Sequence, residues 1–181
     1  PSDATRDSAN LYLQGSSKAS GIPLSPLPNA NMYPVNPADV TSPAIADYNK
    51  FGQLALSTAI AHADWTTTAT NTFAFNASGL TRISRSGETT CSTNGRTCLG
   101  FRNANYDAAS TSPSTTAVNA VDEILAHSTN AAGTNLDPRL LVSYTEFVAA
   151  ADISPNFDDD WFFNSVFHWL INKVYANEIT L

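Results

Sequence analysis

The most apolar stretch of the chain decides the predicted fold; it spans residues 158–177 and reads DDDWFFNSVFHWLINKVYAN. Its aromatic and aliphatic side chains cover most of a helical circumference, and a helix of that kind is normally buried from several sides. The three aspartates at its start suit a helix N-terminus, where negative charge is favourable. They lack the alternating acidic order of an EF-hand loop and therefore do not predict a calcium site. We expect this segment to be a central C-terminal helix.

The same helix has an alternative role at an interface, because aromatic residues are enriched where subunits meet. Its interaction residues would then be Trp161, Phe162 and Trp169. The sequence thus predicts a protein partner or self-association as the alternative to a purely internal role.

Three further helices are predicted from one pattern, a capping side chain followed by proline at the first helical position. They begin at Ser42-Pro43, Ser112-Pro113 and Asp137-Pro138. The first is expected to reach Trp65, the second to end at Gly133 and the third to stop before Pro155. The predicted fold class is mainly α (α+β), with about four helices packed around the aromatic C-terminal helix.

Residues 1–42 are expected to form an extended arm, and residues 43–181 a single globular domain. Six of the ten prolines fall in the arm. A short helix over residues 3–14 and a polyproline-like path over residues 21–40 are predicted there. The arm carries too many apolar residues for a plain linker, so we expect it to lie against the domain or against a partner.

The only two cysteines, Cys91 and Cys98, flank an Asn94-Gly95 pair. Asn-Gly favours a two-residue hairpin turn, which would place the cysteines directly opposite each other at a distance suited to a disulfide. The alternatives are two reduced thiols or half of a zinc site, but two cysteines cannot fill four positions. A disulfide that persists indicates an oxidising compartment.

The residues around this hairpin predict a small antiparallel β-sheet, closed by the disulfide, over about residues 72–102. Alternating side chains near Phe73 and Phe75 indicate strands, and the segments 76–79 and 85–87 are typical of turns. Asn76 also begins an N-glycosylation sequon, which matters only in a eukaryotic protein.

Composition narrows the classes of function. Only 14% of the residues are charged, against roughly 25% in an average soluble protein. The net charge is −7, and no cluster of basic residues is present, which argues against nucleic-acid binding. The longest apolar run is too short for a transmembrane segment. With the predicted disulfide, these features indicate a secreted or cell-surface protein.

Histidines supply the only hypothesis for a catalytic or metal site. His62, His127 and His168 fall on three different predicted helices, and a bundle could bring them together around a metal ion. The competing interpretation is an ordinary surface pair of Glu123 with His127 and a buried, hydrogen-bonded His168. Signatures of nucleotide, hydrolase and zinc-protease sites are absent, and no cofactor is expected.

The sequence therefore favours a non-enzymatic extracellular protein: a surface-structure subunit, an adhesin or a binding module. The alternative is a small secreted metal-dependent or hydrolytic enzyme with a histidine-containing site between helices. A toxin or effector with an inserting aromatic helix is a third hypothesis.

Overall fold

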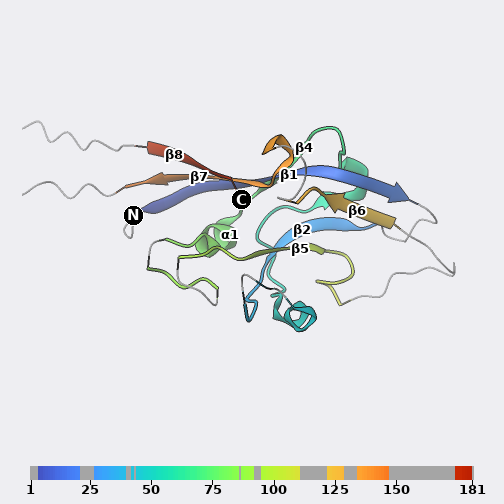
Figure 1. Cartoon of the computed structure of the whole chain (residues 1–181), viewed down its shortest axis with the longest axis horizontal. Coiled ribbons are helices and arrows are strands. Elements are labelled where there is room, and N and C mark those ends of the chain that lie inside the picture. Colours follow the sequence, from blue (N-terminus) through green and yellow to red (C-terminus); the bar gives the residue numbers. More distant parts are fainter. Residues whose placement is uncertain are drawn as a thin grey trace, which may run out of the picture.

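The structure is a computed structural model that describes residues 4–20, 27–39, 42, 44–85, 87–91, 95–110, 122–128, 134–146 and 174–180. Strands account for 43% of these residues and form two antiparallel sheets (Figure 1). The prediction of a mainly α (α+β) domain with four helices around an aromatic helix is therefore wrong.

The larger sheet is built on β1, a strand of 16 residues. Its strands are β1 (Thr5–Ser20), β4 (Thr70–Ala74), β6 (Asp122–Ala126), β7 (Arg139–Thr145) and β8 (Val174–Thr180). Their order is β4-β1-β7-β8, and β6 pairs with the second half of β1, beyond the part that pairs with β7. Three strands thus take their register directly from β1.

β1 buries alternate side chains, as a strand does when one face covers a core. Ala9, Leu11 and Leu13 are at most 7% exposed, whereas Asn10 and Tyr12 are half-buried. The short helix predicted over residues 3–14 is wrong because these apolar residues recur at every second position. The predicted N-terminal arm is also wrong, since β1 lies inside the sheet between β4 and β7.

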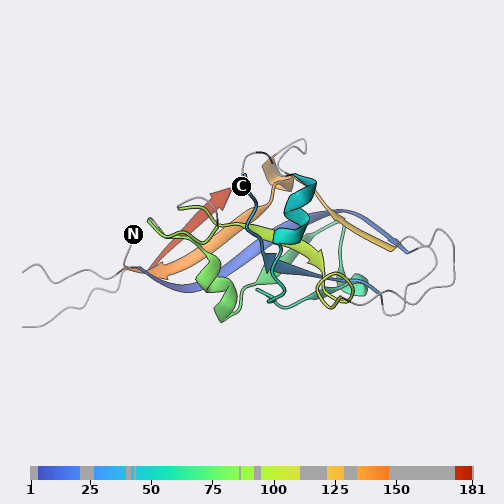
Figure 2. The same cartoon turned by 90° about the horizontal axis from the view of Figure 1, so that it is seen from below.

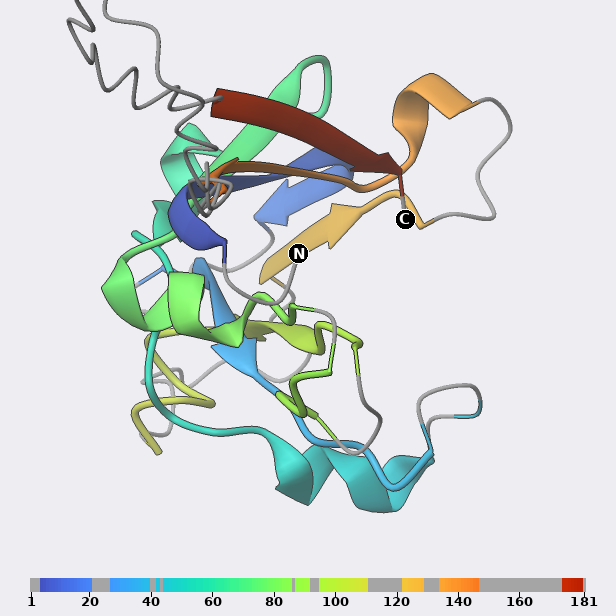
Figure 3. The same cartoon turned by 90° about the vertical axis from the view of Figure 1, so that its left-hand side faces the viewer.

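The smaller sheet consists of β2 (Asn29–Pro34), β3 (Ile60–Ala61) and β5 (Leu99–Asn103), with β2 in the middle. The two sheets form the upper and lower layers in Figure 3, and Figure 2 shows β5 in front of β1. Side chains from both sheets meet in one core. Its buried members are Ala9, Leu11, Leu13, Ala30, Met32, Leu56, Trp65, Phe73, Ile83, Leu140 and Val142. The domain is thus a two-layer β-structure.

Helices in the described residues are short. They are the 3-10 helices η1 (Ile45–Lys50), η2 (His62–Asp64) and η3 (Thr134–Leu136) and the α-helix α1 (Ala77–Arg82). The long helix predicted from Ser42 to Trp65 is wrong: η1 stops after six residues, and the backbone turns extended at Phe51. Only part of its predicted apolar face meets the core: Leu56 is buried there, whereas Ile45 is 97% exposed and Tyr48 56% exposed.

Strands replace the described parts of the other predicted helices. β6 and β7 fall within the helices predicted to begin at Ser112 and Asp137, and β8 overlaps the end of the helix predicted over residues 158–177. In β7, Leu140 and Val142 are buried and Arg139 is exposed, so this short apolar run follows a period of two. Such short runs fit a strand and a helix segment equally well in sequence.

The remainder of the predicted aromatic helix lies outside the described residues. That remainder contains the predicted interaction residues Trp161, Phe162 and Trp169.

The predicted β-sheet over residues 72–102 is only partly present. β4 overlaps the start of this range and β5 overlaps its end, but the two strands belong to different sheets. Between them, Asn76 begins α1: the Gly79 amide donates to its Oδ1 at 2.9 Å, and its Nδ2 donates to the Ala55 carbonyl at 3.0 Å. Asn76 is therefore a helix cap, which accounts for this residue type without a glycan.

Phe73 is the side chain on which the core packing depends most, since it is fully buried between the sheets. We predict that Phe73→Ala lowers the free energy of unfolding by about 3–5 kcal/mol, because it leaves a cavity. Urea unfolding measures the change. Thr72→Ala, at the exposed neighbouring position of β4, is the matched control and should change little. Equal effects of the two variants would contradict this placement of β4.

Candidate functional site

Cys91 and Cys98 form a disulfide, with their Cα atoms 5.7 Å apart. The described residues between 84 and 98 form turns and bends, not a strand pair. Gly95 has a φ of +71°, a conformation that glycine adopts without strain, and its amide donates to the Glu88 carbonyl at 2.8 Å. The disulfide is therefore flanked by turns and bends in the described residues, while residues 92–94 of the predicted hairpin lie outside them.

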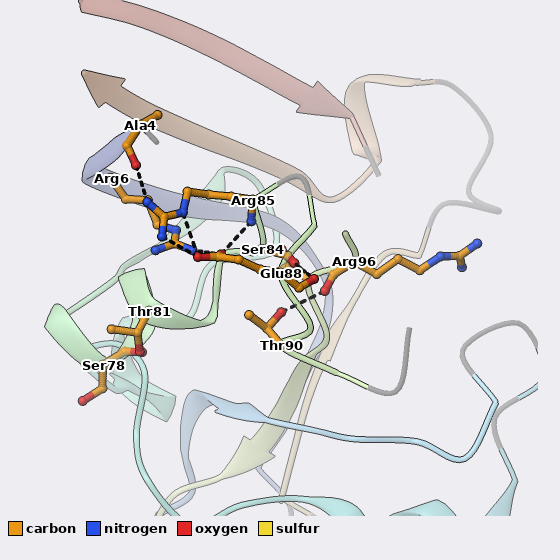
Figure 4. Close-up of polar contacts among 10 residues, drawn as sticks. Ala4, Arg6, Ser78, Thr81, Ser84, Arg85, Glu88, Thr90 and Arg96 are labelled. Carbon is orange, nitrogen blue, oxygen red and sulfur yellow. Dashed lines mark hydrogen bonds and ion pairs between the residues drawn. The ribbon is translucent and has the colours of Figure 1, made fainter. Parts of the chain in front are cut away.

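Glu88 fastens this disulfide loop to the larger sheet (Figure 4). Its carboxylate forms ion pairs with Arg6 of β1 and with Arg85, and the Arg85 backbone amide donates to it at 2.9 Å. Arg85 also donates to the Ala4 carbonyl at 2.8 Å. Hydrogen bonds from Arg85, aided by the charge of Arg6, hold the pKa of Glu88 below its usual value. These contacts thus attach the disulfide loop to the larger sheet.

The structure does not bring the described histidines together. His62 is buried in η2, and its Nε2 lies 3.1 Å from the Ala19 carbonyl of β1. The His127 amide donates to the Gln14 carbonyl, five residues away along the same strand. The third histidine, His168, lies outside the described residues. Within the described residues, no three or more histidine, cysteine, aspartate or glutamate side chains are grouped so that they could hold a metal ion. A site shared by all three histidines stays a prediction.

A cleft of about 280 Å³ opens where the smaller sheet faces β6. Three separate segments line it: the start of β2, the β5 strand with the turn after it, and β6. The lining residues are Pro28, Asn29, Ala30, Phe101, Arg102, Asn103, Asp107, Glu123 and Ile124. The cleft thus combines carboxylates, amides and one aromatic ring, and we call it the intersheet cleft.

Phe101 forms the aromatic wall of the intersheet cleft. Its ring centroid lies 5.7 Å from that of Trp65 and 6.1 Å from that of Phe73, in an edge arrangement with the latter. Both of these neighbours are buried, while Phe101 remains 36% exposed. Because the buried rings fix its position, Phe101 presents a rigid apolar surface to the cleft.

Arg102 is held on the other side of β5 by three aromatic rings and two carbonyls. Its guanidinium lies 5.3–5.9 Å from the ring centroids of Tyr33, Tyr48 and Phe51. It donates to the Gly52 carbonyl at 3.2 Å and to the Asp107 carbonyl at 2.9 Å. No ion pair of Arg102 is found within the described part of the chain. This cation is therefore stabilised by π-systems and peptide dipoles.

Carboxylates enter the cleft from two sides. Ser17 of β1 donates to Glu123 Oε1 at 2.7 Å, which orients this side chain and leaves Oε2 without a partner among the described residues. Asp107 makes its described hydrogen bond through its backbone carbonyl, so its exposed carboxylate is available. Beside Arg102, on the other side of β5, burial raises the pKa of the Tyr33 hydroxyl, and the charge of Arg102 has a smaller, opposite effect.

A second surface, around η1, is apolar. A hollow of about 550 Å³ is lined by Val35, Pro37, Ala44, Ile45, Asp47, Tyr48, Phe51 and Leu99. The amides of Ala44 and Ala38 donate to Asp47, and these hydrogen bonds lower the pKa of its carboxyl. Asp47 thus organises the turn that carries the exposed Ile45 and Tyr48.

The chain matches no protein-family model, no curated protein and no solved structure. Among the described residues, no helix has the length and apolar composition that crossing a bilayer requires. The disulfide indicates an oxidising compartment. Function must therefore be argued from the geometry of the chain itself.

Sequence reasoning missed the intersheet cleft. Its residues come from three segments that are far apart in the chain, and one of them, β6, lies within a predicted helix. The one local signal was the strand expected around Phe101, where an exposed aromatic residue adjoins Arg102 and Asn103.

The contacts of Glu88 lead to a prediction about how stability depends on pH. A carboxyl whose pKa is lower in the folded state stabilises the fold above its unfolded pKa, and this contribution is lost as the pH falls through the folded pKa. We therefore expect Glu88→Gln to lower the urea midpoint at about pH 7 and to lower it much less at about pH 3.

Asp64→Asn is the control for this experiment, since Asp64 is an exposed carboxylate outside the cluster. A Glu88→Gln effect of equal size at both pH values would show that the carboxylate charge is not what fastens the disulfide loop.

Proposed function

We propose that this chain is a non-enzymatic binding module of a secreted or cell-surface protein, and that the intersheet cleft holds its ligand. The observation that carries the proposal is the exposed Phe101 ring beside Asn103, Asp107 and Glu123 in one cleft. Small-molecule sites characteristically combine an apolar surface with a few polar groups that fix orientation.

The volume of the cleft supports a small ligand. At about 280 Å³ it lies just below the range that is usual for small-molecule sites, about 300–1,000 Å³. The cleft is also lined by parts of three strands, and sites on strands are held more rigidly than sites on loops. A preformed site of this kind loses little entropy when its ligand binds.

A binding role is favoured over an enzymatic one because the described cleft holds no nucleophile paired with a base. Its reactive groups are carboxylates, and Glu123 is engaged by Ser17. The predicted histidine-containing enzyme site has no counterpart in the intersheet cleft, since neither His62 nor His127 lines it. The disulfide supports an oxidising compartment, and together with the low content of charged residues it supports the proposed secreted or cell-surface location.

A protein partner or self-association stays a prediction. Within the described residues, its support is the apolar surface around η1, where Ile45, Tyr48 and Leu54 are each more than half exposed.

The proposal is tested by NMR titration of ¹⁵N-labelled protein with five classes of small polar molecule: neutral sugars, sugar acids, amino acids, polyamines and nucleotides. We expect at least one class to shift the amide signals of residues 29–30, 101–103, 107 and 123–124, with no conversion of the added compound. Absence of shifts in the cleft with every class would contradict a binding site there. Conversion of a compound would contradict the non-enzymatic role.

A further inference from the structure

Hydrogen-bond donors and hydrogen-bond acceptors line the intersheet cleft side by side. Asp107 and Glu123 only accept when ionised. The side-chain amide of Asn29 can donate and accept. The Oδ1 atom of Asn103 already accepts hydrogen bonds from the backbone amides of Asn105 and Tyr106. The side-chain NH₂ group of Asn103 therefore remains as a hydrogen-bond donor for a ligand. A ligand that fits this wall must donate and accept at closely spaced positions.

Charged ligands match the donors and acceptors of the cleft poorly. An anionic ligand would meet Asp107 and Glu123, and the chain as a whole carries a net charge of −7. An ammonium ligand has donors and no acceptor, so the NH₂ group of Asn103 would lose water without gaining a partner. A hydroxyl group donates and accepts, which matches both kinds of group with no net charge.

Phe101 adds an apolar face to this polar wall. Its ring is fixed by contacts with the buried Trp65 and Phe73, and it remains partly open to the cleft. A ligand that carries many hydroxyl groups at its edge and C–H groups on its face can use the ring and the polar wall at once. Sugar rings have this distribution of groups.

We propose that the ligand is a neutral saccharide, with one sugar ring stacked on Phe101 and its hydroxyls bonded to Glu123, Asp107 and the asparagine amides. This inference rests on the proposed function, because it assumes that the intersheet cleft is a binding site.

The test uses matched probes that share one ring and differ in charge: methyl glucoside, glucuronic acid and glucosamine, with methyl galactoside and methyl mannoside for stereochemistry. We expect at least one neutral glycoside to shift the cleft amides and to bind more tightly than the charged sugars. Phe101→Leu, which keeps apolar bulk without a flat ring, should weaken that binding by roughly tenfold. Phe101→Tyr should retain it.

Leu54→Ala is the control, because Leu54 is 62% exposed and does not line the cleft. The spread of amide signals in each free variant checks that it has folded. The inference is overturned if Phe101→Leu binds as the wild type does, or if a charged sugar binds more tightly than its neutral counterpart. It is also overturned if only non-sugars shift the cleft amides, in which case the binding module itself stands. Failure of every class removes both proposals.

Discussion

Backbone pairing along β1 is the constraint on which the rest of the described structure depends. β1 is hydrogen-bonded to β4 on one side and to β7 on the other over residues 10–12, and it continues to β6 over residues 15–20. Buried peptide groups must find partners, so a strand enclosed in this way leaves little freedom for its neighbours. Three segments from distant parts of the chain thereby receive one common register.

Close contacts between β1 and the segment before β4 reinforce this arrangement. The buried Asn71 side chain donates to the carbonyls of Leu13 and Thr66, and its Oδ1 accepts from the Thr66 amide at 2.9 Å. At Gly15, a Cβ atom would run into the Thr66 carbonyl and the Trp65 indole. The turn around residue 66 can therefore lie against β1 only where β1 has no side chain.

The two ends of β1 carry different features. Near its start, Arg6 joins Glu88 and so connects the disulfide loop to the sheet. Near its end, Ala19 pairs with Glu123, which places a carboxylate in the intersheet cleft. A stiffened loop and a candidate ligand site are thus attached to one strand, and the strand keeps them apart.

Only the local features could be predicted from the sequence. The spacing of Cys91 and Cys98 predicted their pairing, and the residues around Phe73 and Phe101 indicated strands. The helix predictions failed because a serine or aspartate before proline did not start a long helix: after Ser42 the structure has only the short η1, capped at Ala44, and after Asp137 it has β7. Short apolar runs such as Leu140-Leu141 also fit either period.

The intersheet cleft could not be predicted at all. Asn29, Phe101 and Glu123 become neighbours only through pairings between distant strands, which no local pattern encodes. Asn76 shows the converse case, since its sequon suggested a modification site where the structure shows a helix cap.

The central claim is that β1 is an internal strand bonded on both edges, and hydrogen exchange of the backbone amides under native conditions tests it most directly. Amides of a doubly paired strand exchange only through the largest openings of the protein. The account predicts that residues 9–13 belong to the slowest-exchanging group, together with their partners in β4 and β7. Exchange of residues 9–13 as fast as that of exposed loop residues, such as those at 67–69, would contradict it.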